Sequence, residues 1–205
     1  PDTHLYLHLT RGAQWVSGYG LGDFVIGNGS LDTHSQFSVA SGVYFDEDIS
    51  HTESGVAVGG TIPVLYNEGA GVNLRSDTQT NYAVLNAPAG RLYYNEYTGG
   101  AWQLSEVTDS DFVLYHIFGF NGVSTKTIAV MGQNEYGSRN SARNGASTEI
   151  SNIISQLDVA ELVPIATVIY QTKNSYGNTT KSKILEVESG VNYVDWRTTE
   201  LAQGS

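Results

Sequence analysis

The stretch RNSARNGASTEISNIISQLDVAELVPIATVIYQT, residues 139–172, decides the fold because it contains the one helical pattern followed directly by a strong strand pattern. Its first half places apolar residues at steps of 4, 4, 3, 1 and 3, which form one stripe of a helix: Ala142, Ala146, Ile150, Ile153, Ile154 and Leu157. Asn140 or Ser141 can cap the start, so we predict a helix over residues 141–157. The run 162–172 is rich in β-branched residues and predicts a strand.

Outside this stretch the apolar residues recur with the period of two that is typical of strands. In THLYLHLT, residues 3–10, Leu5, Leu7 and Leu9 point one way and the polar residues point the other. Gly, Asn and Asp separate such segments at the roughly 8–12 residue spacing of sandwiches and barrels. We therefore predict a mainly β protein, an antiparallel β-sandwich or barrel-like body with one helix. The further candidate strands are 23–27, 36–45, 56–66, 81–86, 90–97, 101–107, 112–120, 126–132, 181–188 and 192–197.

The chain shows continuous patterning and carries only four Pro, which favours a single β-rich domain over residues 1–197. Two packed subdomains that divide near residues 110–125 are the alternative. The segment TTELAQGS, residues 198–205, has the composition of a polar exit linker into a further region. The chain begins at Pro1 and its single Met is Met131, so we expect it to be part of a longer or processed polypeptide.

The composition argues against several function classes. The formal charge is −11, and phosphate binding needs clustered Lys and Arg, so we expect no nucleic-acid partner. No apolar run approaches the ~20 residues of a membrane span, so we expect no membrane insertion. The absence of Cys excludes disulfides and thiolate metal sites, which is compatible with a particle that is assembled in a reducing cytoplasm.

The segment YYNEYTGGAWQL, residues 93–104, predicts a hairpin with a two-residue Gly99–Gly100 turn. In this register Tyr97 lies opposite Trp102. Such an aromatic pair serves either structural packing or stacking against a sugar ring. Tyr97 and Trp102 are therefore the candidate contacts for a glycan or another partner.

Candidate catalytic and metal-binding patterns are weak throughout. His4 and His8 share a strand face, but four residues of strand separate their Cα atoms by about 13 Å, too far to chelate one ion. The acids at 46–48 and the pair Asp109 and Asp111 do not fit the calcium-binding EF-hand loop. No nucleophile elbow or phosphate-binding loop occurs, and sequence spacing cannot identify a glycosidase carboxylate pair. We predict no catalytic, cofactor-binding or metal-binding residue and no cofactor.

Polar residues crowd the entry of the predicted helix in IAVMGQNEYGSRNSARNGA, residues 128–146. The free N–H groups of a helix start attract ligands. The same polar groups can equally cap the helix and fix the preceding loop. Both interpretations stay open on the sequence alone.

The final strand candidate ends in the cluster YVDWR, residues 193–197. As a strand it places Val194 and Trp196 on one face and Asp195 and Arg197 on the other. Burial of Trp196 would stabilise a chain end by about 2–3 kcal/mol. Asp195 and Arg197 can pair with each other or bind neighbouring backbone. We interpret Val194, Asp195, Trp196 and Arg197 as a structural latch.

Several segments of the second half resemble one group of proteins when taken in order: GRLYYNEYTGGAW, FVLYHIFGFN, the helix entry quoted above, LVPIATVIYQTK and VNYVDWR. Over residues 85–197 the chain resembles tail-fibre-like, virion-associated structural proteins of tailed bacteriophages. The resemblance implies a non-enzymatic virion component, an attachment or connecting domain of a longer fibre-like chain.

The resemblance also implies partners and a location. A homotrimer that contacts other virion proteins is expected, on an extracellular particle assembled in the host cytoplasm. Two alternatives are a carbohydrate-binding module for host-surface glycans and a capsid decoration or head-fibre protein. A glycosidase or esterase is a third, for which no motif is present.

Overall fold

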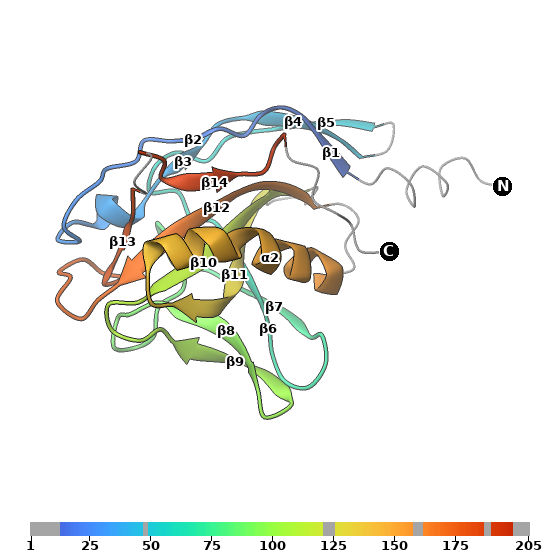
Figure 1. The fold of residues 1–205 in the computed structure, drawn as a ribbon. Helices are drawn as coiled ribbons and strands as arrows, with labels where there is room; N and C mark the ends of the chain where they lie inside the picture. Colours follow the sequence, from blue (N-terminus) through green and yellow to red (C-terminus); the bar gives the residue numbers. More distant parts are fainter. Residues whose placement is uncertain (1–12, 47–48, 121–125, 158–161, 187–189, 199–205) are drawn as a thin grey trace.

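The computed structural model describes residues 13–46, 49–120, 126–157, 162–186 and 190–198 (Figure 1). These residues form a mainly β protein with one α-helix in the C-terminal half, α2, which confirms the predicted fold class. The elements of the first half are β1 (Ala13–Gly18), β2 (Leu21–Gly22), the 3₁₀ helix η1 (Asp32–Ser35), β3 (Ser38–Val39), β4 (Gly42–Asp46), β5 (Ile49–Glu53), β6 (Val64–Asn67) and β7 (Leu74–Asp77). Those of the second half are β8 (Tyr93–Thr98), β9 (Ala101–Glu106), β10 (Phe112–Gly119), β11 (Thr127–Tyr136), α2 (Arg139–Leu157), β12 (Val163–Thr172), β13 (Ser182–Ile184) and β14 (Tyr193–Asp195).

A seven-stranded sheet forms the centre of the molecule, in the order β13-β12-β10-β11-β6-β7. The seventh strand, β14, pairs with β12 on the same edge as β13. β14 lies along residues 166–168 of β12 and β13 along residues 170–172. Most neighbours are antiparallel, but β11 and β6 run parallel through the pairs Ala129–Val64 and Val130–Leu65. The sheet therefore joins strands of the first half to strands of the second half of the chain.

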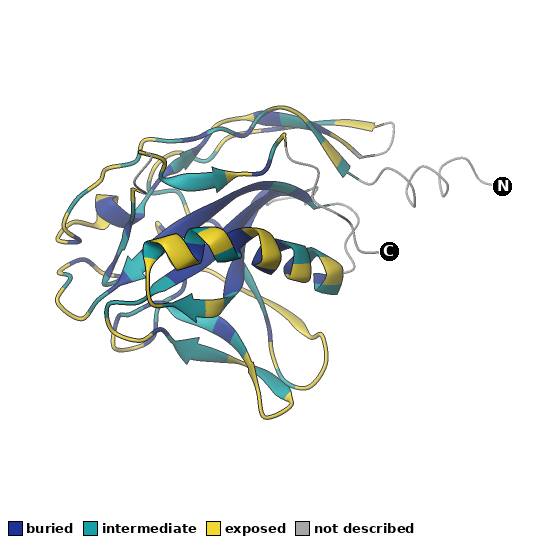
Figure 2. Ribbon diagram, in the orientation of Figure 1, coloured by how far each residue is buried: buried dark blue, intermediate teal, exposed yellow. Residues whose placement is uncertain are grey.

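The central strands are buried on both faces, as the dark blue ribbon in Figure 2 shows. On one face, Leu114 and Phe118 of β10 pack with Ile150 of α2. On the other face, Tyr115 and Ile117 belong to a larger core shared with the first half of the chain. Burial on both sides explains why β10 is a continuous apolar run rather than an alternating one.

α2 begins at Arg139, two residues before the predicted start at 141, and ends at Leu157 as predicted. The predicted caps, Asn140 and Ser141, are wrong because Ser138 takes that position. The backbone N–H of Ser141 donates to Ser138 Oγ over 3.1 Å, and the hydroxyl of Ser141 donates back to the Ser138 carbonyl over 2.8 Å. This N-cap bond satisfies one of the donors that a helix start leaves free.

The strand predictions succeed best where pairing is local. The hairpins β8–β9 and β12–β13 form as predicted. The predicted strand 81–86 is instead a buried loop, whose apolar residues cover the core and leave a single bridge at Asn86. The predicted strand 23–27 is also wrong, since β2 ends at Gly22. The predicted strand over 3–10 and most of the predicted linker, 199–205, lie outside the described residues.

Candidate functional site

The β8–β9 hairpin carries the predicted aromatic pair. Gly99 and Gly100 have φ values of 60° and 85°, the positive values that a two-residue hairpin turn requires. Tyr97 and Trp102 are directly opposed, as the sequence predicts. Their ring centroids lie 5.0 Å apart with the planes tilted by 55°. The Tyr97 ring is 57% exposed, so this pair presents an aromatic surface to solvent.

Side-chain and backbone bonds hold this hairpin against the end of β6 and the loop that follows it. Asn95 is buried on β8, where its Oδ1 accepts from the Asn67 N–H at 2.7 Å and its Nδ2 donates to the Asn67 carbonyl at 2.9 Å. The backbones of Trp102 and Gly69 exchange two bonds of 2.9 Å. The aromatic pair is thus carried by a hairpin with fixed orientation.

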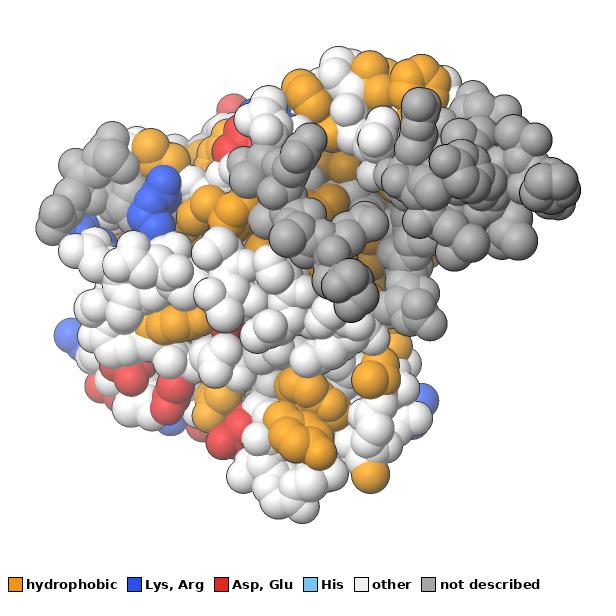
Figure 3. Space-filling model, turned by 45° about the vertical axis from the view of Figure 1, so that its right-hand side comes forward, with side chains coloured by type: hydrophobic (Ala, Val, Ile, Leu, Met, Phe, Trp, Pro, Cys, Tyr) orange, Lys and Arg blue, Asp and Glu red, His pale blue; other side chains and the backbone are white. Residues whose placement is uncertain are grey.

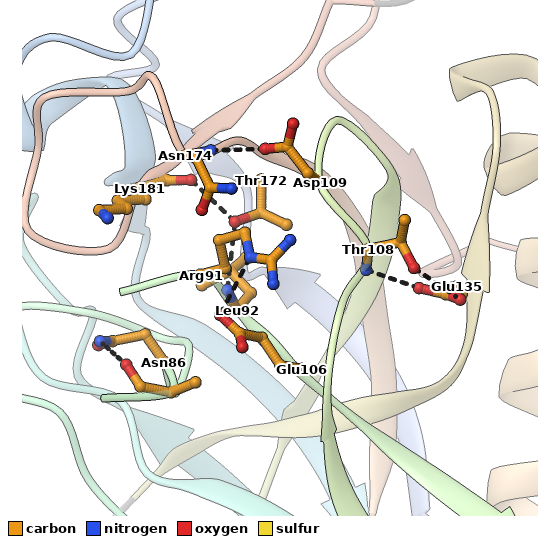
Figure 4. A network of polar contacts seen from close by, with 11 residues as sticks. Asn86, Arg91, Leu92, Glu106, Thr108, Asp109, Glu135, Thr172, Asn174 and Lys181 are labelled. Carbon is orange, nitrogen blue, oxygen red and sulfur yellow. Dashed lines mark hydrogen bonds and ion pairs between the residues drawn. The ribbon is translucent and has the colours of Figure 1, made fainter. Parts of the chain in front are cut away.

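A second set of polar contacts anchors the base of the hairpin (Figure 4). Arg91 Nε donates to Glu106 Oε1 over 3.0 Å in a half-buried ion pair. The Thr108 N–H and hydroxyl both donate to the carboxylate of Glu135 on β11, at 2.8 and 3.2 Å. These contacts bring the end of β9 against β11 and fix where Glu135 lies.

An open groove of about 420 Å³ lies between the hairpin, β11 and α2. We call it the hairpin groove. Its volume falls in the ~300–1,000 Å³ range of small-molecule sites. Three aromatic rings, two carboxylates and three amides line it: Tyr94, Tyr97, Trp102, Glu96, Glu135, Gln133, Asn134 and Asn152. Figure 3 shows acidic and hydrophobic side chains below the helix, on the side of the hairpin.

Local contacts set the protonation of two groups in the hairpin groove. The hydroxyl of Ser105 and the amide of Gln103 donate to Glu96 at 2.6 and 3.3 Å, and these bonds lower the pKa of Glu96. Burial, with the charges of Glu135 and Glu96 nearby, raises the pKa of Tyr94. At neutral pH the groove therefore offers an ionised carboxylate that accepts hydrogen bonds and an un-ionised phenol whose hydroxyl interacts with that carboxylate.

A buried polar network lies directly beneath the groove. Glu149 of α2 is 1% exposed, and its Oε2 accepts bonds from Asn134 Nδ2 at 2.8 Å and from the Tyr136 hydroxyl at 2.9 Å. Its Oε1 lies 3.0 Å from Nε2 of the fully buried His116. Asn134 belongs both to this network and to the lining of the hairpin groove.

The network continues from His116 to the end of the described chain. His116 Nδ1 lies 2.7 Å from the Thr167 hydroxyl, which accepts a bond of 2.7 Å from Trp196 Nε1. With a proton on Nε2 of His116, every donor in this chain has an acceptor. Trp196 then donates to Thr167, the Thr167 hydroxyl to Nδ1 of His116, and Nε2 of His116 to Glu149. A hydroxyl, an imidazole and a carboxyl group also form a hydrolytic triad, but here the hydroxyl lies at Nδ1 and the carboxyl at Nε2, the reverse of that arrangement. All three side chains are buried, so we assign them a structural role.

Sequence reasoning missed this network, although two signals for it exist. Glu149 falls on the apolar stripe of the helix, three residues after Ala146 and four before Ile153. His116 interrupts the otherwise apolar run of β10. A buried charged or polar group on an apolar face needs a partner. Each of the two residues therefore predicts that a polar partner exists, but not which residue it is.

The predicted latch residues come together at the edge of the central sheet. Trp196 is buried on the helix side, and Val194 packs against the same core. Arg197 Nε lies 2.9 Å from Asp195 Oδ1, and Arg197 Nη1 donates to the Gly18 carbonyl at 2.9 Å. These contacts connect β14 to β1. Their effect on stability stays a prediction.

A hollow of about 500 Å³ on the other side of the hairpin offers a single aromatic ring, Tyr93. Among the described residues, no three His, Asp or Glu side chains gather so that they could hold a metal ion. None of the helices in the described region combines the length and the apolar character that crossing a bilayer requires.

Comparisons with models of protein families, with curated proteins and with solved structures found no match.

Proposed function

We propose that this protein is a non-enzymatic attachment domain that binds saccharides in the hairpin groove. The observation that carries the proposal is the aromatic pair of the exposed Tyr97 and the half-buried Trp102, in the lining of a groove that also holds carboxylate and amide residues. Apolar faces of sugar rings stack on aromatic side chains, and sugar hydroxyls exchange hydrogen bonds with carboxylates and amides. The hairpin groove presents both kinds of group from elements that are fixed by Asn95 and Glu135.

We further propose that the domain belongs to the virion of a tailed bacteriophage, as part of a longer fibre-like chain. The resemblance over residues 85–197 supports this assignment, and the Cys-free, acidic composition is compatible with it. A capsid decoration or head-fibre protein is the alternative location. Antibody labelling of intact particles, viewed by negative-stain electron microscopy, distinguishes tail from head. Absence of label from purified particles would contradict both locations.

Binding is tested on a glycan array with Trp102→Ala and Tyr97→Ala. We expect either change to reduce saccharide binding at least about tenfold, because stacking on an aromatic ring contributes roughly 1–3 kcal/mol. Leu31→Ala is the matched control, because Leu31 lies outside the groove and is 59% exposed, a fraction similar to the 57% of Tyr97. Binding that survives both aromatic substitutions would overturn the proposal.

A glycosidase is the competing function, because two carboxylates line the groove. Such an enzyme needs one carboxyl with a raised pKa as its general acid. The pKa of Glu96 is lowered by Ser105 and Gln103, so Glu96 does not suit that role. Release of new reducing ends from a bound polysaccharide, lost in Glu135→Gln, would establish the enzyme instead of the binding domain.

A further inference from the structure

The charges of the hairpin groove are all of one sign. Glu96 and Glu135 line it, and neither Lys nor Arg is among its lining residues. Two arginines outside this lining make their hydrogen bonds with other groups, although the charge of Arg91 also attracts Glu135. Arg91 pairs with Glu106, and Arg143 of α2 donates to the Tyr193 carbonyl at 3.4 Å. A ligand in the groove therefore meets a net negative charge.

The helix surface beside the groove carries no charge to offset it. The exposed residues of α2 are uncharged and polar: Asn140, Ser141, Asn144, Ser147, Thr148, Asn152 and Ser155. A solvent-facing helix surface usually carries Lys and Glu. Asn152 joins this surface to the groove, because it lines the groove itself. Figure 3 shows the same region as a largely uncharged surface above the acidic side chains.

Each carboxylate is held in place by donors from the neighbouring strand β9 or from the loop that follows it. Glu96 accepts from Ser105 and Gln103 on β9, and Glu135 accepts from Thr108. A carboxylate oxygen has two acceptor positions, so both groups can still accept a bond from a ligand. Neither carboxylate can turn away from an approaching anion without giving up these bonds.

We infer that the hairpin groove selects saccharides by charge, binding amine-bearing and neutral chains and excluding acidic ones. This inference rests on the proposed saccharide-binding function and names its ligand class. An ammonium group in the groove gains attraction from Glu96 and Glu135. A uronic acid or sulfate group meets two like charges at the same place.

The test compares three oligosaccharides of equal chain length by isothermal titration calorimetry: chitosan, chitin and polygalacturonate. At low ionic strength we expect chitosan to bind about fivefold tighter than chitin, and polygalacturonate about fivefold weaker or not at all. The differences should shrink as the salt concentration rises to about 0.15 M, because the charges lie near solvent.

Glu96→Gln and Glu135→Gln should bring the three affinities together, whereas Asp77→Asn, a charge change outside the groove, should leave the ranking intact. Equal affinities of the wild-type protein for all three chains overturn the inference and leave the proposed function standing. Failure of all three to bind overturns the proposed function as well. A ranking that persists in both glutamine variants also overturns the inference, since the charge would then act from another place.

Discussion

Trp196 connects the last described strand to the core through a single side-chain bond. Its indole N–H donates to the Thr167 hydroxyl, which in turn contacts His116. The ring itself packs among the side chains between α2 and the central sheet. Packing and hydrogen bonding by this residue can therefore be separated by substitution.

We expect Trp196→Phe to lower the free energy of unfolding by about 1–2 kcal/mol, because a smaller aromatic ring remains in the core but the donor to Thr167 is lost. Trp196→Ala should cost about 3–5 kcal/mol, because a cavity is also formed. Thermal denaturation followed by circular dichroism measures both variants. An unchanged melting temperature in Trp196→Ala would remove the latch interpretation.

Asp195 gives a prediction about pH. Its bonds from Arg197 lower its pKa below the ordinary value of 3.8. A lowered pKa in the folded state stabilises the protein above the unfolded pKa, and this contribution is lost as the pH falls through the folded pKa. The destabilisation by Asp195→Asn should therefore be present at neutral pH and fade below about pH 3.8.

Urea denaturation of the wild-type protein and of Asp195→Asn across this pH range measures the difference in their free energies of unfolding. Arg197→Gln and the double variant complete a double-mutant cycle. The cycle separates the coupling energy of Asp195 and Arg197 from the bond of Arg197 to Gly18. A coupling energy that stays constant from neutral pH to pH values below the folded pKa would contradict the assignment.

At the scale of elements, α2 and the β8–β9 hairpin show what a local pattern can predict. The helix stripe and the Gly99–Gly100 turn depend on residues a few positions apart. The structure confirms the Tyr97–Trp102 pairing and all of the predicted stripe except Ile154, which is only partly buried. The sequence pattern predicts a strand over 81–86, where the structure has a buried loop. Burial by distant elements gives a loop the same apolar composition as a buried strand. The cap was misplaced because Asn140, Ser141 and Ser138 all have suitable side chains.

The position of the cap leads to a prediction for α2. Ser138→Ala removes the bond to the Ser141 N–H and should destabilise the protein by about 1 kcal/mol. Ser147→Ala is the matched control on the exposed face of the same helix, and it should be neutral or slightly stabilising because Ala favours helix. Equal effects in denaturation experiments would show that Ser138 does not act as the cap.

At the scale of the whole molecule, a central sheet buried on both faces accounts for the strong apolar strands of the second half. The first half supplies smaller sheets on the face opposite α2, among them β1, β4 and β5 (Figure 1). On this outer sheet Val16, Phe45 and Ile49 are 41%, 40% and 52% exposed. Contiguous apolar patches mark contacts between subunits, but the register of β4 and β5 places Phe45 and Ile49 on opposite faces of this sheet.

The proposed fibre-like role predicts a homotrimer in solution. We expect light scattering after size-exclusion chromatography to give three times the chain mass, and Phe45→Asp to shift the protein toward monomer if the β1–β4–β5 sheet forms the contact. The circular dichroism spectrum of the variant controls for folding. A wild-type protein that is monomeric at high concentration would count against the fibre assignment.

The sequence by itself determined the local features of this protein: a β-rich chain with one helix, the register of the Tyr97–Trp102 pair, and the opposite faces of Asp195 and Trp196. Periodicity and turn chemistry suffice for these, since each depends on neighbours along the chain. Only the tertiary structure brought Tyr97 and Trp102 beside Gln133, Glu135 and Asn152, and placed Glu149 against His116 and Trp196 against Thr167. Those contacts join residues from separate elements, and the packing of α2 and the hairpin on the central sheet decides them rather than the spacing of residues in the chain.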